Sequence, residues 1–242
     1  MIVAPLLRHT RHAMAIAMTL IASAVAAQSA GPSPASPAGS ADDRALLQSA
    51  VAHRGIGADS AAAVIYLFTD FACPDCALFI AQRLDSLVAA AVTPGRARLI
   101  HATFLIPRLL RGWQGASAAY CIAAITDVRT FDEAARRIFA EQGTWALARD
   151  AAPPLRAIAR DVGADPGRFD DCTARNVMAP LLLSDVRAGF AAGITGTPTL
   201  VVLAAKALAD RTRDPFEGAV TLRGDVPLSQ VLAAVAKVTK TK

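Results

Sequence analysis

The sequence predicts an α/β fold in which a βαβ half and a ββα half form a mixed central sheet, with an all-helical insertion between the halves. Residues 63–68 are a continuous apolar stretch of strand length, and a helical pattern separates them from a second strand over 97–104, which is typical of two parallel strands. Two further strand patterns, 199–203 and 219–222, precede a last helix and suit antiparallel pairing. From about 109 to 189 only helical periodicity is present, which predicts the insertion.

The first 27 residues have the pattern of a secretory signal peptide. Arg8 and Arg11 precede an apolar run over 13–25, and small residues follow at Ala26 and Ala27, where we expect cleavage. An uncleaved membrane anchor is the alternative, although the run is short for a bilayer span. Residues 28–40 contain mainly Pro, Ser, Ala and Gly, which predicts a disordered linker before a folded domain over 41–242.

The first half of the domain is predicted element by element. Acidic residues followed by apolar residues at helical spacing indicate a helix over 42–51, which Gly55 and Gly57 end. The strand over 63–68 is apolar on both faces and therefore central. A single helix follows Cys76 and ends at 93–95 (Thr-Pro-Gly), before the strand over 97–104.

The second half begins with the insertion, whose helices are expected to break at Gly143, at 153–154 and at 163–167. A polar loop over 210–218 joins the two antiparallel strands, and residues 227–238 form the closing helix. The aromatic side chains at helical positions, among them Trp113, Phe139 and Trp145, are expected to pack in the core.

Charge excludes one class of function. The net charge of the chain is +5, and it is +3 without the first 27 residues, which contain Arg8 and Arg11 and no acidic residue. Lysine and arginine are scattered, with no long basic run beside aromatic residues, so we expect no nucleic-acid partner.

The segment Cys73-Pro74-Asp75-Cys76 carries the chemistry. A strand that ends at a cysteine and continues as a helix places the sulfur at the helix N-terminus, where backbone amides and the helix dipole stabilise a thiolate. Cys73 is therefore the candidate nucleophile, and Pro74 suits the first helical position because it needs no hydrogen-bonded amide. Cys76, one turn later, is placed to attack Cys73 and resolve a mixed disulfide.

Asp75 lies between the two cysteines in the sequence. A carboxylate so close to the thiols opposes thiolate formation, so we predict a milder oxidant than a motif with histidine at this position would give. A structural zinc site is the alternative for a C-x-x-C pair, but His53 and His101 are isolated and no second ligand pair exists. We expect neither a metal ion nor another cofactor.

At this point the sequence resembles the DsbA-like branch of the thioredoxin superfamily. Residues 68–76 look like that family's active-site segment, and 193–199 (Gly-Ile-Thr-Gly-Thr-Pro-Thr) look like its cis-proline loop. The resemblance covers roughly 61–238 and implies a thioredoxin-like fold. It also implies that Pro198 is cis beside the active-site cysteines and that Thr197 and Pro198 bind an extended substrate; an ordinary turn is the alternative for this loop.

One position departs from the family pattern. The family often has a buried glutamate six residues before the first cysteine, where it is thought to relay protons, and this chain has Leu67. Asp70 and Asp75 are the candidate substitutes, acting through water.

Cys121 and Cys172 both lie in the insertion. We expect them to form a structural disulfide in an oxidising compartment, and some DsbA-like proteins carry an extra pair at similar places. Two buried free thiols are the alternative.

Together these features predict an exported thiol–disulfide oxidoreductase that exchanges disulfides with cysteine-containing exported proteins, with an oxidase-like role favoured. The resemblance implies a membrane redox partner that resets the active site. A reductase or isomerase, a soft-metal (copper) carrier using the same thiols, and a binding module with vestigial thiols are the alternatives. The absence of a dedicated dimerisation domain favours a monomer, and the Ala- and Arg-rich composition favours a bacterial periplasm.

Overall fold

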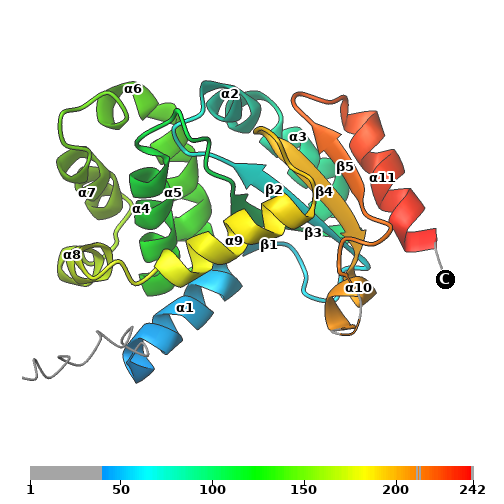
Figure 1. Ribbon diagram of the computed structural model, residues 1–242, viewed down its shortest axis with the longest axis horizontal. Coiled ribbons are helices and arrows are strands. Elements are labelled where there is room, and N and C mark those ends of the chain that lie inside the picture. The colour runs from blue at the N-terminus through cyan, green and yellow to red at the C-terminus, as the bar shows by residue number, and fades with distance from the viewer. Residues whose placement is uncertain (1–39, 211, 213, 241–242) are drawn as a thin grey trace, which may run out of the picture. The chain divides into compact units, whose positions relative to one another are not determined.

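The computed structural model describes residues 40–240 except 211 and 213. The predicted signal peptide lies outside the described residues, as does the predicted linker except Ser40, whose side chain caps the first helix by accepting from the Asp43 amide. Within the described part, a five-stranded sheet has the order β1-β3-β2-β4-β5 (Figure 1). β2 and β3 are parallel, and every other pair is antiparallel. The strands are β1 (Gly55–Ile56), β2 (Ala63–Thr69), β3 (Ala97–Thr103), β4 (Thr199–Ala204) and β5 (Val220–Arg223).

Helices cover both faces of the sheet and form the insertion. Before β3 they are α1 (Ala41–His53), α2 (Pro74–Gln82), α3 (Leu84–Leu87) and the π-helix η1 (Val88–Val92). Between β3 and β4 they are α4 (Gly112–Ile125), α5 (Val128–Ala140), α6 (Gln142–Trp145), α7 (Ala152–Asp161), α8 (Pro166–Ala174) and α9 (Ala179–Ala191). The last two are α10 (Ala205–Ala209) and α11 (Leu228–Lys240). The predicted fold class, a mixed sheet with an all-helical insertion, is confirmed.

The two sheet faces contribute to two apolar clusters. Ile65, Leu99 and Val202 align across three strands and pack in the larger cluster, with side chains of α2, α11 and the insertion helices. Phe68 and Val201 point the opposite way, into a smaller cluster at α9, which crosses in front of the sheet in Figure 1. Because β2 is buried on both faces, its register is fixed, and its carboxyl end is a rigid support for the residues that follow.

The structure joins Cys121 of α4 to Cys172 of α8 by a disulfide that spans 51 positions of sequence. Both residues are fully buried. The bond therefore links two helices of the insertion that are far apart in the sequence.

Removing this bond is expected to lower the free energy of unfolding by about 4 kcal/mol, because a loop of this length gives the reduced unfolded chain that much additional conformational freedom. The measurement is urea unfolding of a Cys121→Ala/Cys172→Ala variant against the parent protein. Thiol counting gives a second check: two alkylatable cysteines beyond the active-site pair in the denatured, unreduced protein would show that the bond does not form.

A buried ion pair connects the insertion to the sheet. Arg54, which precedes β1, donates to Asp185 of α9 at 2.5 Å. The same carboxylate oxygen accepts from the Tyr120 hydroxyl at 2.8 Å and from the Thr103 amide at 3.0 Å. All four residues are buried, so one buried carboxylate accepts hydrogen bonds from three separate parts of the chain.

His101 of β3 is fully enclosed, and neither ring nitrogen has a hydrogen-bond partner. Its ring meets Phe131 edge-on, with centroids 5.3 Å apart. Burial lowers the pKa of His101 to about 4; the nearby Asp132 opposes this shift, and Arg136 and Arg54 add to it. The folded protein therefore holds this imidazole in its neutral form.

Because the pKa is depressed on folding, the unfolded chain binds the proton first, and stability is lost as the pH falls from about 6.5 towards 4. A His101→Leu variant should escape this loss. Relative to the parent protein, its free energy of unfolding should rise by about 2 to 3 kcal/mol on going from pH 7.5 to pH 4.5. Urea unfolding of both proteins at the two pH values measures their difference in the free energy of unfolding. If this difference is the same at pH 7.5 and pH 4.5, His101 is not held in its neutral form.

Three details differ from the sequence predictions. The short strand β1 was not predicted; it pairs with β3 directly after α1. The single helix expected after Cys76 is divided into α2, α3 and η1; α2 ends at Arg83, whose φ of −119° lies well away from the ideal helical value. α10 begins immediately after β4, where the prediction had no regular element.

Candidate active site

Cys73 is the N-cap residue of α2, at the carboxyl end of the central strand β2. Its backbone is extended, with φ −84° and ψ 120°, and Pro74 occupies the first helical turn. The Cys73 amide donates to the Asp70 carbonyl at 2.9 Å. An Asp70 carboxylate oxygen accepts from the Ala72 amide at 2.8 Å. These two bonds turn the chain from strand to helix within four residues and fix the direction in which Cys73 points.

The loop before β4 lies directly against this turn. The Thr197–Pro198 peptide bond is cis, and the Cys73 sulfur lies 3.6 Å from the Thr197 carbonyl oxygen, to which its thiol can donate. Cys73 is 7% exposed and Cys76 is fully buried, and both are free thiols. The fold thus brings together Cys73, Cys76, Thr197 and Pro198, which the sequence places more than a hundred residues apart.

The two thiols differ sharply in their proton affinity. A hydrogen bond from Cys76 lowers the pKa of Cys73 to about 6, against the effect of burial, and the Thr197 side chain and the backbone of Cys76 and Asp75 act in the same direction. Burial and the neighbouring Cys73 sulfur raise the pKa of Cys76 far above its usual range. Near neutral pH Cys73 is therefore the thiolate and Cys76 retains its proton.

The two predicted modulating carboxylates occupy different environments. Asp75 is exposed on the first turn of α2. Asp70 is fully buried, and burial raises its pKa although its oxygens accept from the amides of Ala72 and Ile106, each at 2.8 Å. Leu67 packs in the core beneath them. Asp70 thus ties the active-site turn to the segment that leads into the insertion, and a role in proton transfer stays a prediction.

A groove of about 160 Å³ lies next to the active-site turn; its lining includes Asp75, which stands between the two cysteines in the sequence, but neither cysteine. Leu78 and Phe79 of α2 line one side and Thr197 and Pro198 line the other. Leu78 is 54% exposed, which leaves its apolar side chain available for contact at the groove. At the groove, Arg83 donates to Asp225 at 2.7 Å and 2.8 Å in a two-pronged ion pair.

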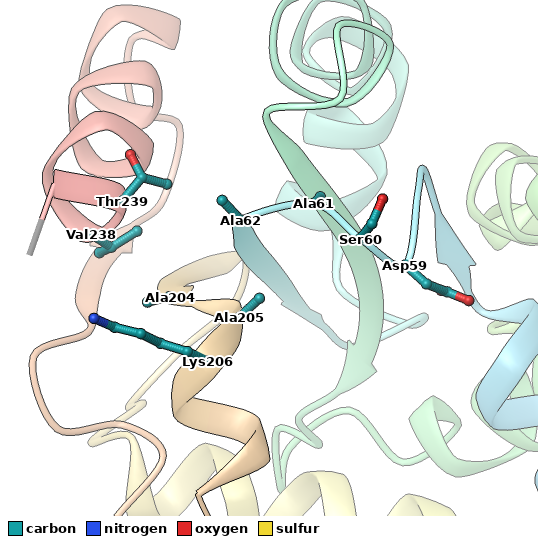
Figure 2. A pocket seen from close by; sticks show the side chains of 9 residues that line it. All are labelled: Asp59, Ser60, Ala61, Ala62, Ala204, Ala205, Lys206, Val238 and Thr239. Carbon is teal, nitrogen blue, oxygen red and sulfur yellow. The ribbon is translucent and has the colours of Figure 1, made fainter. Parts of the chain in front are cut away.

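A second hollow, of about 300 Å³, lies at the far end of the sheet (Figure 2). It is lined by residues 59–62 before β2, 204–206 after β4, and Val238 and Thr239 of α11. Since Ala62 precedes β2 and Cys73 follows it, the length of a seven-residue strand, roughly 20 Å, separates this hollow from the thiols. It is not part of the active site.

Sequence reasoning missed a contact from the insertion. The side-chain amide of Gln142, in α6, donates to the Phe71 carbonyl at 2.6 Å and to the Cys73 carbonyl at 3.0 Å. Gln142 lies about seventy positions from these acceptors, and nothing in its local sequence distinguishes it from a surface residue. The groove residues Arg83 and Asp225 were missed for the same reason.

His53 and His101, considered above as metal ligands, lie away from the two thiols, and so does Met178, whose sulfur could bind a soft metal ion. The His53 ring is 2.8 Å from the Ala123 carbonyl, His101 is enclosed beside Phe131, and Met178 is buried in the insertion. Among residues 40–240, leaving aside 211 and 213, no three His, Cys, Asp or Glu side chains gather as a metal-binding group. In the same part of the chain no helix combines the length and apolar character needed to cross a membrane.

Comparison with known proteins identifies the fold. BdbD of Bacillus subtilis, in its oxidised form, is similar at a TM-score of 0.64 and 15% identity, over 78% of this chain and 94% of that protein. α-DsbA1 of Wolbachia pipientis is similar at a TM-score of 0.61 and 18% identity, over 77% of this chain and 90% of that protein. DsbA of Chlamydia trachomatis is similar at a TM-score of 0.60 and 17% identity, over 76% of this chain and 89% of that protein. No curated protein matches the sequence.

A family model described as thioredoxin matches residues 49–221, which include the Cys73–Cys76 turn, the insertion and the cis-proline loop. The chain therefore belongs to the thioredoxin family, with the helical insertion and overall fold of the DsbA-like proteins.

Proposed function

We propose that the protein is an exported thiol–disulfide oxidoreductase that introduces disulfides into other exported proteins. The observation that carries this proposal is the position of the Cys73 sulfur. It lies at the N-terminus of α2 and against the Thr197–Pro198 loop, with its pKa lowered to about 6 beside a protonated, buried Cys76. Stabilising the Cys73 thiolate stabilises the reduced enzyme, and that makes its disulfide a better oxidant.

The reaction starts from the oxidised enzyme with a Cys73–Cys76 disulfide. A substrate thiolate attacks the Cys73 sulfur, the bond to Cys76 breaks, and the Cys76 sulfur leaves and takes up a proton. A second substrate thiolate then attacks the first substrate sulfur, which is bonded to Cys73 in the mixed disulfide. The Cys73 thiolate leaves. The substrate loses two electrons and gains a disulfide, while the enzyme becomes the dithiol.

The low pKa of Cys73 promotes the second step, because a stable thiolate is a good leaving group. The enclosed position of Cys76 limits attack from outside to Cys73, which is the more exposed of the two sulfurs. A membrane redox partner would then accept two electrons from the dithiol and restore the disulfide.

The groove next to the active-site turn is the proposed substrate site. An extended substrate segment would lie along Thr197 and Pro198 and cover the exposed Leu78. The lining combines apolar side chains, Leu78 and Phe79, with polar ones such as Asp75 and Gln82, which suits extended chains of varied sequence. The signal peptide over 1–27 and the linker over 28–40 belong to the same proposal, which places the protein in the periplasm as a monomer.

The test is oxidation of a reduced, unfolded protein by the purified, oxidised enzyme in the absence of other oxidants. Each enzyme molecule should transfer one disulfide within the mixing time, read from the loss of free thiols in the substrate. If the reverse reaction, in which the reduced enzyme gives two electrons to a disulfide-containing substrate, goes further towards completion under matched conditions, the protein is a reductase or isomerase. No transfer in either direction would exclude the proposed function.

A further inference from the structure

Gln142 makes a two-point contact with the backbone that carries the nucleophile. Its amide nitrogen donates to the carbonyl of Phe71, two residues before Cys73, and to the carbonyl of Cys73 itself. The Cys73 carbonyl also accepts the Ala77 amide at 3.1 Å, which is the first helical bond of α2. One side chain of the insertion thus spans the turn and reaches the first turn of the active-site helix.

The position of Gln142 is fixed by a buried aromatic group. Trp145, on the same short helix, is fully enclosed and donates to the Ile138 carbonyl at 2.7 Å. Phe71 stacks on Phe139 with ring centroids 4.5 Å apart. At Gly115 of α4, a side chain would collide with both Trp145 and Phe71. Because these rings leave little freedom, Gln142 is held at the turn before any substrate arrives.

We propose that Gln142 is a positioning residue for Cys73, which holds the backbone on both sides of the nucleophile so that the first amides of α2 stay directed at its sulfur. This inference rests on the proposed function, because it assigns Gln142 a part in setting the reactivity of that same thiol. The hydrogen bonds of Gln142 described above go to main-chain carbonyls and not to the reacting sulfur atoms. It acts through the main chain of the turn.

Three observations support a role beyond packing. The contact uses both hydrogens of one amide nitrogen, which apolar side chains of the same size cannot replace. Both acceptors are main-chain carbonyls of the active-site turn. The amides of Asp75 and Cys76 lower the pKa of Cys73, so any loosening of the turn that carries them weakens this stabilisation.

The experiment compares Gln142→Met with the parent protein. Methionine keeps the length and approximate volume but cannot donate, so a packing role predicts no change. We expect the Cys73 pKa to rise and its alkylation rate at pH 5 to fall about fivefold, the equilibrium equivalent of one ordinary net hydrogen bond. The rate is followed by mass spectrometry of the Cys73 peptide in the fully reduced protein, as a function of pH.

Gln142→Glu gives a second, independent readout. Above the carboxyl pKa this variant places a negative charge beside the turn and donates nothing, so its Cys73 pKa should rise further than in Gln142→Met. The matched control is Gln114→Met, which makes the same substitution at an exposed position of α4. It should leave the pH dependence of the Cys73 alkylation rate unchanged. Unfolding in urea verifies that all variants are folded under the assay conditions.

Each outcome separates the inference from the proposed function. Superimposable curves for Gln142→Met and the parent protein, with a low Cys73 pKa in both, would overturn the positioning role and leave the function intact. An ordinary thiol pKa in the parent protein, together with no disulfide transfer, would overturn the function itself.

Discussion

A Cys76→Ala variant is expected to accumulate mixed disulfides with its substrate proteins, whereas a Cys73→Ala variant forms none. Without Cys76, a Cys73 thiolate that has attacked a substrate disulfide has no neighbouring thiol to release it. Cys76 is fully buried, so in the Cys73→Ala variant the remaining thiol cannot reach a protein substrate. Both variants should lose net disulfide transfer by several orders of magnitude, because catalysis needs the pair as a unit.

The measurement is non-reducing electrophoresis of each variant after incubation with a disulfide-containing unfolded protein, followed by reduction to recover the two components. Cys121→Ala/Cys172→Ala is the matched control, since it removes two cysteines outside the active site and should retain transfer. Adducts formed equally by the Cys73→Ala and Cys76→Ala variants would contradict the assignment of Cys73 as the nucleophile.

The largest expected loss of stability follows from Asp185→Leu. This change removes the carboxylate that pairs with the buried Arg54 and leaves the Thr103 amide without its acceptor, whereas the Tyr120 hydroxyl keeps only the His101 carbonyl, at 3.2 Å. Removing one partner of a buried ion pair costs about 3 to 5 kcal/mol, because the remaining charge stays in an apolar environment. Urea unfolding at pH 7 measures the change in the free energy of unfolding.

The double variant Arg54→Met/Asp185→Leu distinguishes the unpaired charge from the loss of packing. It should recover a substantial part of the stability, since no buried charge remains, although the Thr103 amide still lacks its acceptor. A double variant less stable than Asp185→Leu would mean that the contacts of Arg54 with Tyr120, a hydrogen bond to the hydroxyl and a position over the ring, outweigh the cost of the unpaired charge.

The fold class could be predicted from the sequence because the features that indicate it lie in short stretches of consecutive residues. The central strands β2 and β4 are nearly unbroken apolar stretches, and the cysteine pair follows β2 directly. The residues 196–199 (Gly-Thr-Pro-Thr) form a common turn sequence that gains meaning only beside the cysteine pair, and the structure brings this loop against Cys73. The role of each of these site residues in catalysis stays a prediction that the variants above test.

What the sequence could not reveal depends on contacts between distant segments. The break at Arg83 interrupts a helical pattern that is continuous in the sequence, and the Arg83 side chain is paired with Asp225, 142 positions away. β1 has only two residues, too few for a periodic signal. Gln142, Arg54 and Asp185 are ordinary polar residues until the chain folds, because only then do their acceptors and donors come within reach.

The most direct test of the central claim is the reduction potential of the Cys73–Cys76 pair. The purified protein is equilibrated in glutathione buffers of graded redox ratio, and free thiols are trapped by alkylation at each ratio. An oxidase with a stabilised Cys73 thiolate should have a potential between the ~−120 mV of strong periplasmic oxidants and the ~−180 mV of disulfide isomerases. A potential near thioredoxin's ~−270 mV, or no redox transition at all, would contradict it.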